Sequence, residues 1–238
     1  MPSAAASVAA LTATKSGVPK VAIVVAAVVL GALAVTVLSN RGSKSAVTTT
    51  VTATTVASAN GSPASTNALA AKPGETQPVV ITGATLADLP EKGDDPAIGQ
   101  PAPVISGRDF QGAPVVVTPG DGKPKLMLFV AHWCPHCQRE VPLVVKWLKD
   151  GSIPPSIDVV AISTSFKSAQ GNPPSKWLAK EGWSNTIVVD DEKSTAALAY
   201  GLTGFPFFTL VDAEGNVVAR ASGELGLPDL QALLAKVS

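Results

Sequence analysis

Cys134 and Cys137 are the only cysteines in the chain, and they lie in the segment Ala131-His132-Trp133-Cys134-Pro135-His136-Cys137. The segment follows an apolar run and precedes a helical pattern, so we expect Cys134 at the N-terminus of a helix. Unpaired backbone N–H groups and the positive end of the helix dipole favour a thiolate there. An exposed Cys134 thiolate can attack a substrate disulfide, and Cys137, one turn along, can resolve the mixed disulfide. The pair therefore predicts reversible redox chemistry.

The two residues between the cysteines suit this chemistry. Pro135 would occupy the first helical turn, where its missing N–H matters least and its fixed φ is suitable. His136 can bring a positive charge or a hydrogen bond to the Cys134 thiolate, and we expect it to stabilise that state.

Three other roles for the cysteines fit the residues less well. A zinc site needs about four ligands, and the only histidines, His132 and His136, are crowded with the cysteines on one turn. Covalent haem attachment needs a histidine directly after the second cysteine, where Gln138 stands. A permanent disulfide would close too short a loop to stabilise the fold much. We expect no metal and no organic cofactor, only a redox-active disulfide.

Alternating apolar runs and turn signals predict the elements around this segment. The expected strands are Val115–Thr118, Lys125–Ala131, Ile157–Ser163, Thr186–Asp190, Phe207–Val211 and Val217–Ala221. The expected helices are 134–149, Pro174–Glu181, Glu192–Tyr200 and Leu227–Val237. Strands that alternate with helices and end in a hairpin predict an α/β fold, with a mixed central sheet and helices on both faces.

An apolar run near the N-terminus predicts a membrane anchor. Residues 21–38 carry no charge, and only Thr36 has a polar side chain. That length nearly crosses a bilayer core, so we expect a single transmembrane helix after a cytoplasmic tail at 1–20. A cleaved signal peptide and a buried core helix are the alternatives. The signal peptide is disfavoured because its apolar region is usually shorter and a clean cleavage site is missing here.

The segment after the apolar run indicates which side of the membrane the main domain occupies. Lysines and arginines flank the run equally, so they do not decide the orientation. Residues 39–78 are rich in Ser, Thr and Ala, which is typical of a flexible tether. We therefore expect residues 79–238 to form a domain held outside the cytoplasm at the cell membrane.

The distribution of charge argues against nucleic acid as a partner. The chain has 18 basic and 18 acidic residues, but every acidic residue lies at or after Glu75. The C-terminal body is therefore mildly acidic and lacks the clustered Lys and Arg that bind phosphates.

Trp133 followed by the Cys-Pro-His-Cys sequence after a strand resembles the active site of the thioredoxin superfamily. The segment 203–208 (Thr-Gly-Phe-Pro-Phe-Phe) is similar to the cis-proline segment of that family. The resemblance implies a thioredoxin-like fold with its core at 97–238 and a cis bond between Phe205 and Pro206 beside the redox pair. It also implies that the Phe205 backbone binds the substrate chain, with Trp133 and Phe205 as an apolar rim.

Glu140 and Pro142 extend the resemblance to the TlpA/ResA branch, which consists of membrane-tethered thiol reductases outside the cytoplasm. The segment Ile98–Pro103 and the extra strand–helix unit before Pro206 fit the same branch. The resemblance implies that Glu140 lies near Cys137 and tunes its proton transfers. It also implies protein thiols or disulfides as substrates and a membrane or envelope redox protein as the electron donor.

Rival functions stay open. The Pro-His dipeptide resembles DsbA-type oxidases, so a disulfide-introducing oxidase is the first alternative to a reductase. Leu128 replaces the buried aspartate of cytosolic thioredoxins. A thiol peroxidase is disfavoured because Ala131 stands where its threonine would be. A redox-inert binding module or chaperone is the alternative of a different class.

Overall fold

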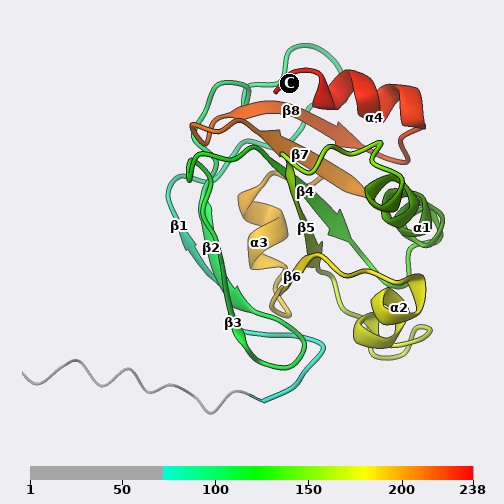
Figure 1. The fold of residues 1–238 in the computed structure, drawn as a ribbon. Coiled ribbons are helices and arrows are strands. Elements are labelled where there is room, and N and C mark those ends of the chain that lie inside the picture. The colour runs from blue at the N-terminus through cyan, green and yellow to red at the C-terminus, as the bar shows by residue number, and fades with distance from the viewer. Residues whose placement is uncertain (1–71, 238) are drawn as a thin grey trace, which may run out of the picture. The chain divides into compact units, whose positions relative to one another are not determined.

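The computed structural model describes residues 72–237. An eight-stranded sheet has the order β1-β2-β6-β5-β4-β7-β8, with β3 paired to β2 (Figure 1). The strands are β1 (Val80–Thr82), β2 (Val104–Arg108), β3 (Pro114–Val117), β4 (Lys125–Val130), β5 (Asp158–Ser163), β6 (Thr186–Val189), β7 (Phe207–Val211) and β8 (Val217–Ser222). The helices are α1 (Pro135–Lys149), α2 (Pro174–Glu181), α3 (Thr195–Ala199) and α4 (Leu227–Leu234).

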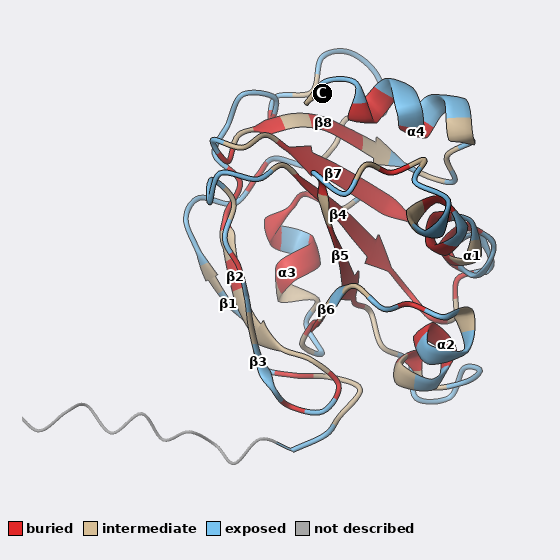
Figure 2. Cartoon of the chain, viewed as in Figure 1, coloured by how far each residue is buried: buried red, intermediate tan, exposed pale blue. Residues whose placement is uncertain are grey.

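Strand β4 is the centre of the sheet and leads directly into the cysteine segment. It pairs in parallel with β5 and antiparallel with β7, while β5 pairs in parallel with β6 and β7 antiparallel with β8. All residues of β4 are buried because helices cover both faces of the sheet there (Figure 2). The predicted mixed sheet with a terminal hairpin is confirmed.

Alternate residues of β4 supply two separate hydrophobic cores, as the two-residue period of a strand requires. Leu126, Leu128 and Val130 pack with α1, α2 and α4 on one face. Met127 and Phe129 pack with α3 on the other face, under the β1–β3 strands (Figure 1). The predicted thioredoxin-like fold with helices on both faces is therefore confirmed, and α1 packs against the first core.

Some elements differ from the prediction. Strand β1 is short and partly exposed, so it lacks the apolar alternation that would reveal it. Helix α3 begins at Thr195 rather than Glu192, because the Asp191 carboxylate accepts hydrogen bonds from the backbone N–H groups of Lys193 and Thr195 and holds a turn. Helix α4 ends at Leu234 rather than Val237.

The folded domain begins earlier than the boundary expected at residue 79. Gly74 donates a backbone hydrogen bond to Phe110, and Gln77 donates one to Asp190. The Glu75 carboxylate accepts from the backbone N–H and the hydroxyl of Ser175 at the start of α2. These contacts fix residues that the composition had assigned to the tether.

The predicted transmembrane helix at 21–38 and most of the tether lie outside the described residues. Across residues 72–237, no helix is both long and apolar enough to cross a membrane.

Candidate active site

The turn between β4 and α1 places Cys134 at the N-cap of the helix, directly before Pro135. Its backbone N–H donates to Ala131 and its carbonyl accepts from Gln138, both at 3.0 Å. Both cysteines are free thiols. The expected exposure of Cys134 is wrong: only 6% of the residue is accessible, because it packs in the core cluster that Trp133 and Phe205 border. Most of Cys134 is therefore shielded from solvent.

Cys137 lies one turn further along α1 and is fully buried. Its Sγ accepts a hydrogen bond from the backbone N–H of Ala131 at 3.4 Å. Burial is the main cause that raises the pKa of Cys137, and negative charge on Cys134 and Glu140 raises it further. The thiol form of Cys137 is therefore strongly favoured, so this cysteine needs a proton acceptor before it can act as a nucleophile.

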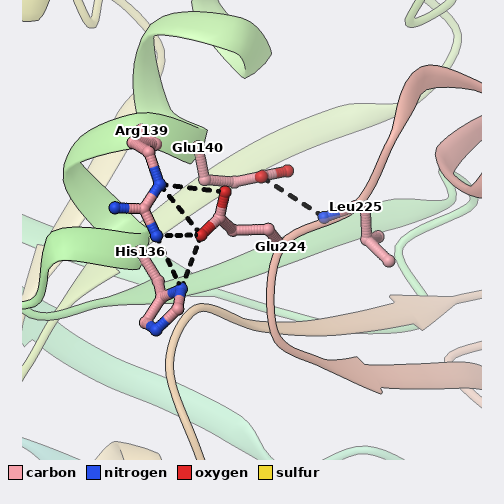
Figure 3. A network of polar contacts seen from close by, with 5 residues as sticks. All are labelled: His136, Arg139, Glu140, Glu224 and Leu225. Atoms are coloured by element: carbon pink, nitrogen blue, oxygen red, sulfur yellow. Dashed lines mark hydrogen bonds and ion pairs between the residues drawn. The ribbon is translucent and has the colours of Figure 1, made fainter.

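Glu140 lies on α1 three positions after Cys137, where side chains share a helix face, and it is also fully buried. Its Oε2 accepts from the backbone N–H of Leu225 at 3.3 Å, while Oε1 has no hydrogen-bond partner (Figure 3). Burial raises the pKa of Glu140 from 4.5 to about 7, and the nearby Glu224 charge contributes in the same direction. A carboxyl group with this pKa can both accept and donate a proton near neutral pH.

The peptide bond between Phe205 and Pro206 is cis, as the resemblance implied. Pro206 is buried directly before β7, whose first residue Phe207 pairs with Phe129 near the end of β4. The Phe205 ring meets the Trp133 ring edge-on, with 5.9 Å between the centroids. The cis-proline segment and the cysteine turn therefore lie side by side, and Trp133 and Phe205 together form an apolar border.

The loop after β5 holds Trp133 in place. The indole Nε1 donates to the Ser165 carbonyl at 2.7 Å, and the Lys167 ammonium lies 3.6 Å from the ring centroid. The buried His132 fixes the same loop: its Nε2 accepts from the Lys167 backbone N–H, so its Nδ1 carries the hydrogen and donates to the Asn172 carbonyl. His132 thus has a structural role beside the site.

His136 is exposed and pairs with an acidic residue. Its Nδ1 lies 2.5 Å from Oε1 of Glu224, in the turn after β8 (Figure 3). The Arg139 guanidinium binds the same carboxylate, with Nη2 2.5 Å and Nε 3.1 Å from Oε1. Sequence reasoning missed Arg139 and Glu224. Arg139 is one helical turn from His136, which is a local signal, but Glu224 is far away in the sequence and only folding brings it here.

Within residues 72–237, no cluster of three or more His, Cys, Asp or Glu side chains could hold a metal ion. The two free thiols, Cys134 and Cys137, directly support thiol–disulfide exchange with a substrate.

A helix-capping cysteine pair beside a cis-proline on a mixed sheet defines a thioredoxin-like oxidoreductase. A family model described as Redoxin matches residues 97–234. The chain belongs to the Redoxin family, and it is a thiol–disulfide oxidoreductase.

Among individual proteins, the thiol:disulfide interchange protein DsbE of Pasteurella multocida is 31% identical over 145 residues, which cover 56% of this chain and 74% of that protein. The thiol:disulfide interchange protein HelX of Rhodobacter capsulatus is 31% identical over 107 residues, 44% of this chain and 55% of that protein. The solved thioredoxin domain of a thiol-disulfide oxidoreductase from Bacteroides vulgatus is 26% identical, with a TM-score of 0.48 over 59% of this chain and 96% of that chain. The Redoxin match and the two sequence relatives confirm the resemblance to the TlpA/DsbE/ResA type.

Proposed function

We propose that the protein is a membrane-anchored reductase of protein disulfides outside the cytoplasm. The observation that carries this proposal is the buried pair of Cys137 and Glu140. A resolving thiol with a raised pKa stands on the same helix face as a carboxyl group with a pKa of about 7 and an oxygen without a partner. Such a carboxyl group can accept the Cys137 proton at the moment when Cys137 must become a nucleophile.

The proposed cycle moves two electrons to the substrate. The Cys134 thiolate attacks one sulfur of a substrate disulfide, which forms a mixed disulfide and releases the other sulfur as a thiolate. Glu140 then accepts the Cys137 proton, and Cys137 attacks the Cys134 sulfur. This step forms the Cys134–Cys137 disulfide and releases the second substrate sulfur as a thiolate. A membrane or envelope redox protein returns two electrons to the disulfide, and the proton on Glu140 returns to Cys137, which restores the Cys134 thiolate and the Cys137 thiol.

The apolar border would receive the substrate chain. Phe205 stands before the cis-proline, and its backbone would align an extended peptide next to Cys134, as the family resemblance implies. Trp133 and Phe205 would contact apolar side chains around the substrate cysteine, and Pro135 would limit the approach from the helix side. This arrangement favours protein substrates over small thiols.

The reduction potential of the full-length protein in detergent micelles tests the direction of electron flow. A value near that of thioredoxin, about −270 mV, supports a reductase. A value near that of DsbA, about −120 mV, supports the alternative, an oxidase that introduces disulfides. The Pro-His dipeptide is the observation that favours this second candidate. A chain with no reversible couple, whose activity survives Cys134→Ser with Cys137→Ser, would instead be a redox-inert binding module.

The anchor is proposed from residues 21–38 alone. Alkaline carbonate should leave the full-length protein in the membrane pellet. Protease added to cells with a permeabilised envelope but an intact cytoplasmic membrane should digest the domain. Release of the protein by carbonate, or cleavage after the apolar run, would remove the anchor from the proposal.

A further inference from the structure

The turn between β8 and α4 contacts the first two turns of the active-site helix, α1. Glu224 binds the side chains of His136 and Arg139, and the next residue, Leu225, donates its backbone N–H to Glu140 (Figure 3). This short segment therefore contacts one residue that follows Cys134 on α1 and two that follow Cys137.

The contacts at Glu224 make a compact charged cluster. Its Oε1 lies 2.5 Å from both the His136 Nδ1 and the Arg139 Nη2, and its Oε2 lies 3.3 Å from the Arg139 Nε. The same His136 Nδ1 also lies 2.9 Å from the Arg139 Nη2, so the three side chains form one connected cluster. The pKa of Glu224 is lowered, first by the hydrogen bonds from Arg139 and then by that from His136, so the carboxylate stays ionised.

Arg139 also lies within electrostatic reach of the nucleophile. Its pKa is raised mainly by the hydrogen bonds to Glu224, and negative charge on Cys134 adds to the rise. His136 directly follows Pro135 in the same first turn. Without an acidic partner, the positive charge of Arg139 and a hydrogen bond or positive charge from His136 would stabilise the Cys134 thiolate. A stabilised thiolate makes the reduced form more favourable and the disulfide more oxidising.

We propose that Glu224 is a positioning residue that holds His136 and Arg139 in a neutralised cluster and so makes the Cys134–Cys137 couple more reducing than its Pro-His dipeptide would otherwise allow. This inference rests on the proposed function, in which the Cys134–Cys137 dithiol is a reductant, and it assigns to Glu224 a part in setting the reduction potential of that couple. It also resolves the conflict between a reductase-like frame and an oxidase-like dipeptide.

The equilibrium with glutathione measures this effect directly. The protein disulfide and two molecules of reduced glutathione give the protein dithiol and one molecule of glutathione disulfide, so bonds, electrons and protons balance. In the full-length protein, Glu224→Gln and Glu224→Ala should both increase the equilibrium constant for reduction about tenfold. That change corresponds to a potential about 30 mV less negative. Glu224→Ala also removes the amide oxygen that could still accept from Arg139.

A matched control separates this effect from a general change of charge. Glu214 is an exposed glutamate in the turn between β7 and β8, so Glu214→Gln removes the same charge elsewhere on the surface. It should leave the potential unchanged. Because the Glu224 side chain is one-third exposed, at 33%, we expect its variants to keep the wild-type thermal midpoint, which is measured alongside.

A background without the His136 imidazole and the Arg139 guanidinium shows whether Glu224 acts through these two side chains. In a His136→Asn and Arg139→Gln background, Glu224→Gln should shift the equilibrium constant by less than twofold. A wild-type potential in both Glu224 variants, or a full shift in the neutral background, would overturn the proposal. Either result would leave a reversible couple intact, whereas failure of the proposed function would show as no couple at all or as a strongly oxidising wild-type protein.

Discussion

The surroundings of the two cysteines differ more than their spacing suggests. Cys134 is only 6% accessible, but the side chains of His136 and Arg139, which follow it on α1, are 59% and 56% exposed. Cys137 faces the interior, where Glu140 is fully buried and one of its oxygens has no partner. Exposed charges are screened by water and salt, whereas a buried group keeps the full effect of desolvation. We infer that the exposed charges have a modest effect on the reactivity of the first cysteine, while burial controls the pKa of the second.

The largest expected effect separates the roles of the two thiols. Cys134→Ser should reduce disulfide-reductase activity to the uncatalysed rate, because no nucleophile then forms the mixed disulfide. Cys137→Ser should also stop turnover but trap the mixed disulfide on Cys134, visible as a reducible adduct on a non-reducing gel. An adduct trapped by Cys134→Ser instead would reverse the assignment.

Removing the buried carboxyl group tests the interior side. Glu140→Gln should slow the resolving step about 100-fold at pH 7, which is within the usual range for a general base. In the wild type the rate should rise with pH through about 7, where Glu140 ionises, and this inflection should vanish in the variant. Rapid-quench kinetics of mixed-disulfide decay measure both the rate of the resolving step and its dependence on pH. Unchanged decay would show that water, not Glu140, accepts the proton.

The same carboxyl group should affect stability. The pKa of Glu140 is about 7 in the folded protein against 4.5 in the unfolded chain, so the folded state binds more protons between these values. The free energy of unfolding should therefore fall as pH rises through this window, by on the order of 3 kcal/mol. Denaturant unfolding measures this at pH 4.5 and pH 8. The free energy of unfolding of Glu140→Gln, relative to that of the wild type, should be higher at pH 8 than at pH 4.5 by this amount. A constant difference between the proteins would contradict the raised pKa.

The smallest expected effect concerns salt. Raising the ionic strength from about 0.05 M to about 1 M shortens the Debye length to about 3 Å and should reduce the potential shift caused by Glu224→Gln by about half. The kinetic inflection near pH 7 should persist, because Glu140 is buried. Redox titrations and pH–rate profiles at both salt concentrations check the contrast. Equal salt sensitivity would show that the two cysteines share one environment.

Much of the fold and part of the site could be predicted because the signals are local. The continuous apolar run of β4 predicted a strand, and the helical pattern after it placed Cys134 at a helix N-terminus. The cis bond before Pro206 followed from a family motif. Strand β1, by contrast, is short and partly exposed, and the bonds of Glu75 to Ser175 join distant segments that look like linker in composition.

The amino-acid order by itself determined the redox chemistry, since two cysteines that begin a helix and a proline that begins a strand are properties of neighbouring residues. Only the tertiary structure decided how each cysteine is tuned. Glu140 is distinctive because folding removes water from it, and Glu224 matters because β8 returns it to His136 and Arg139. Desolvation and charge pairing depend on distances between segments that are remote in sequence, so the packed fold alone establishes them.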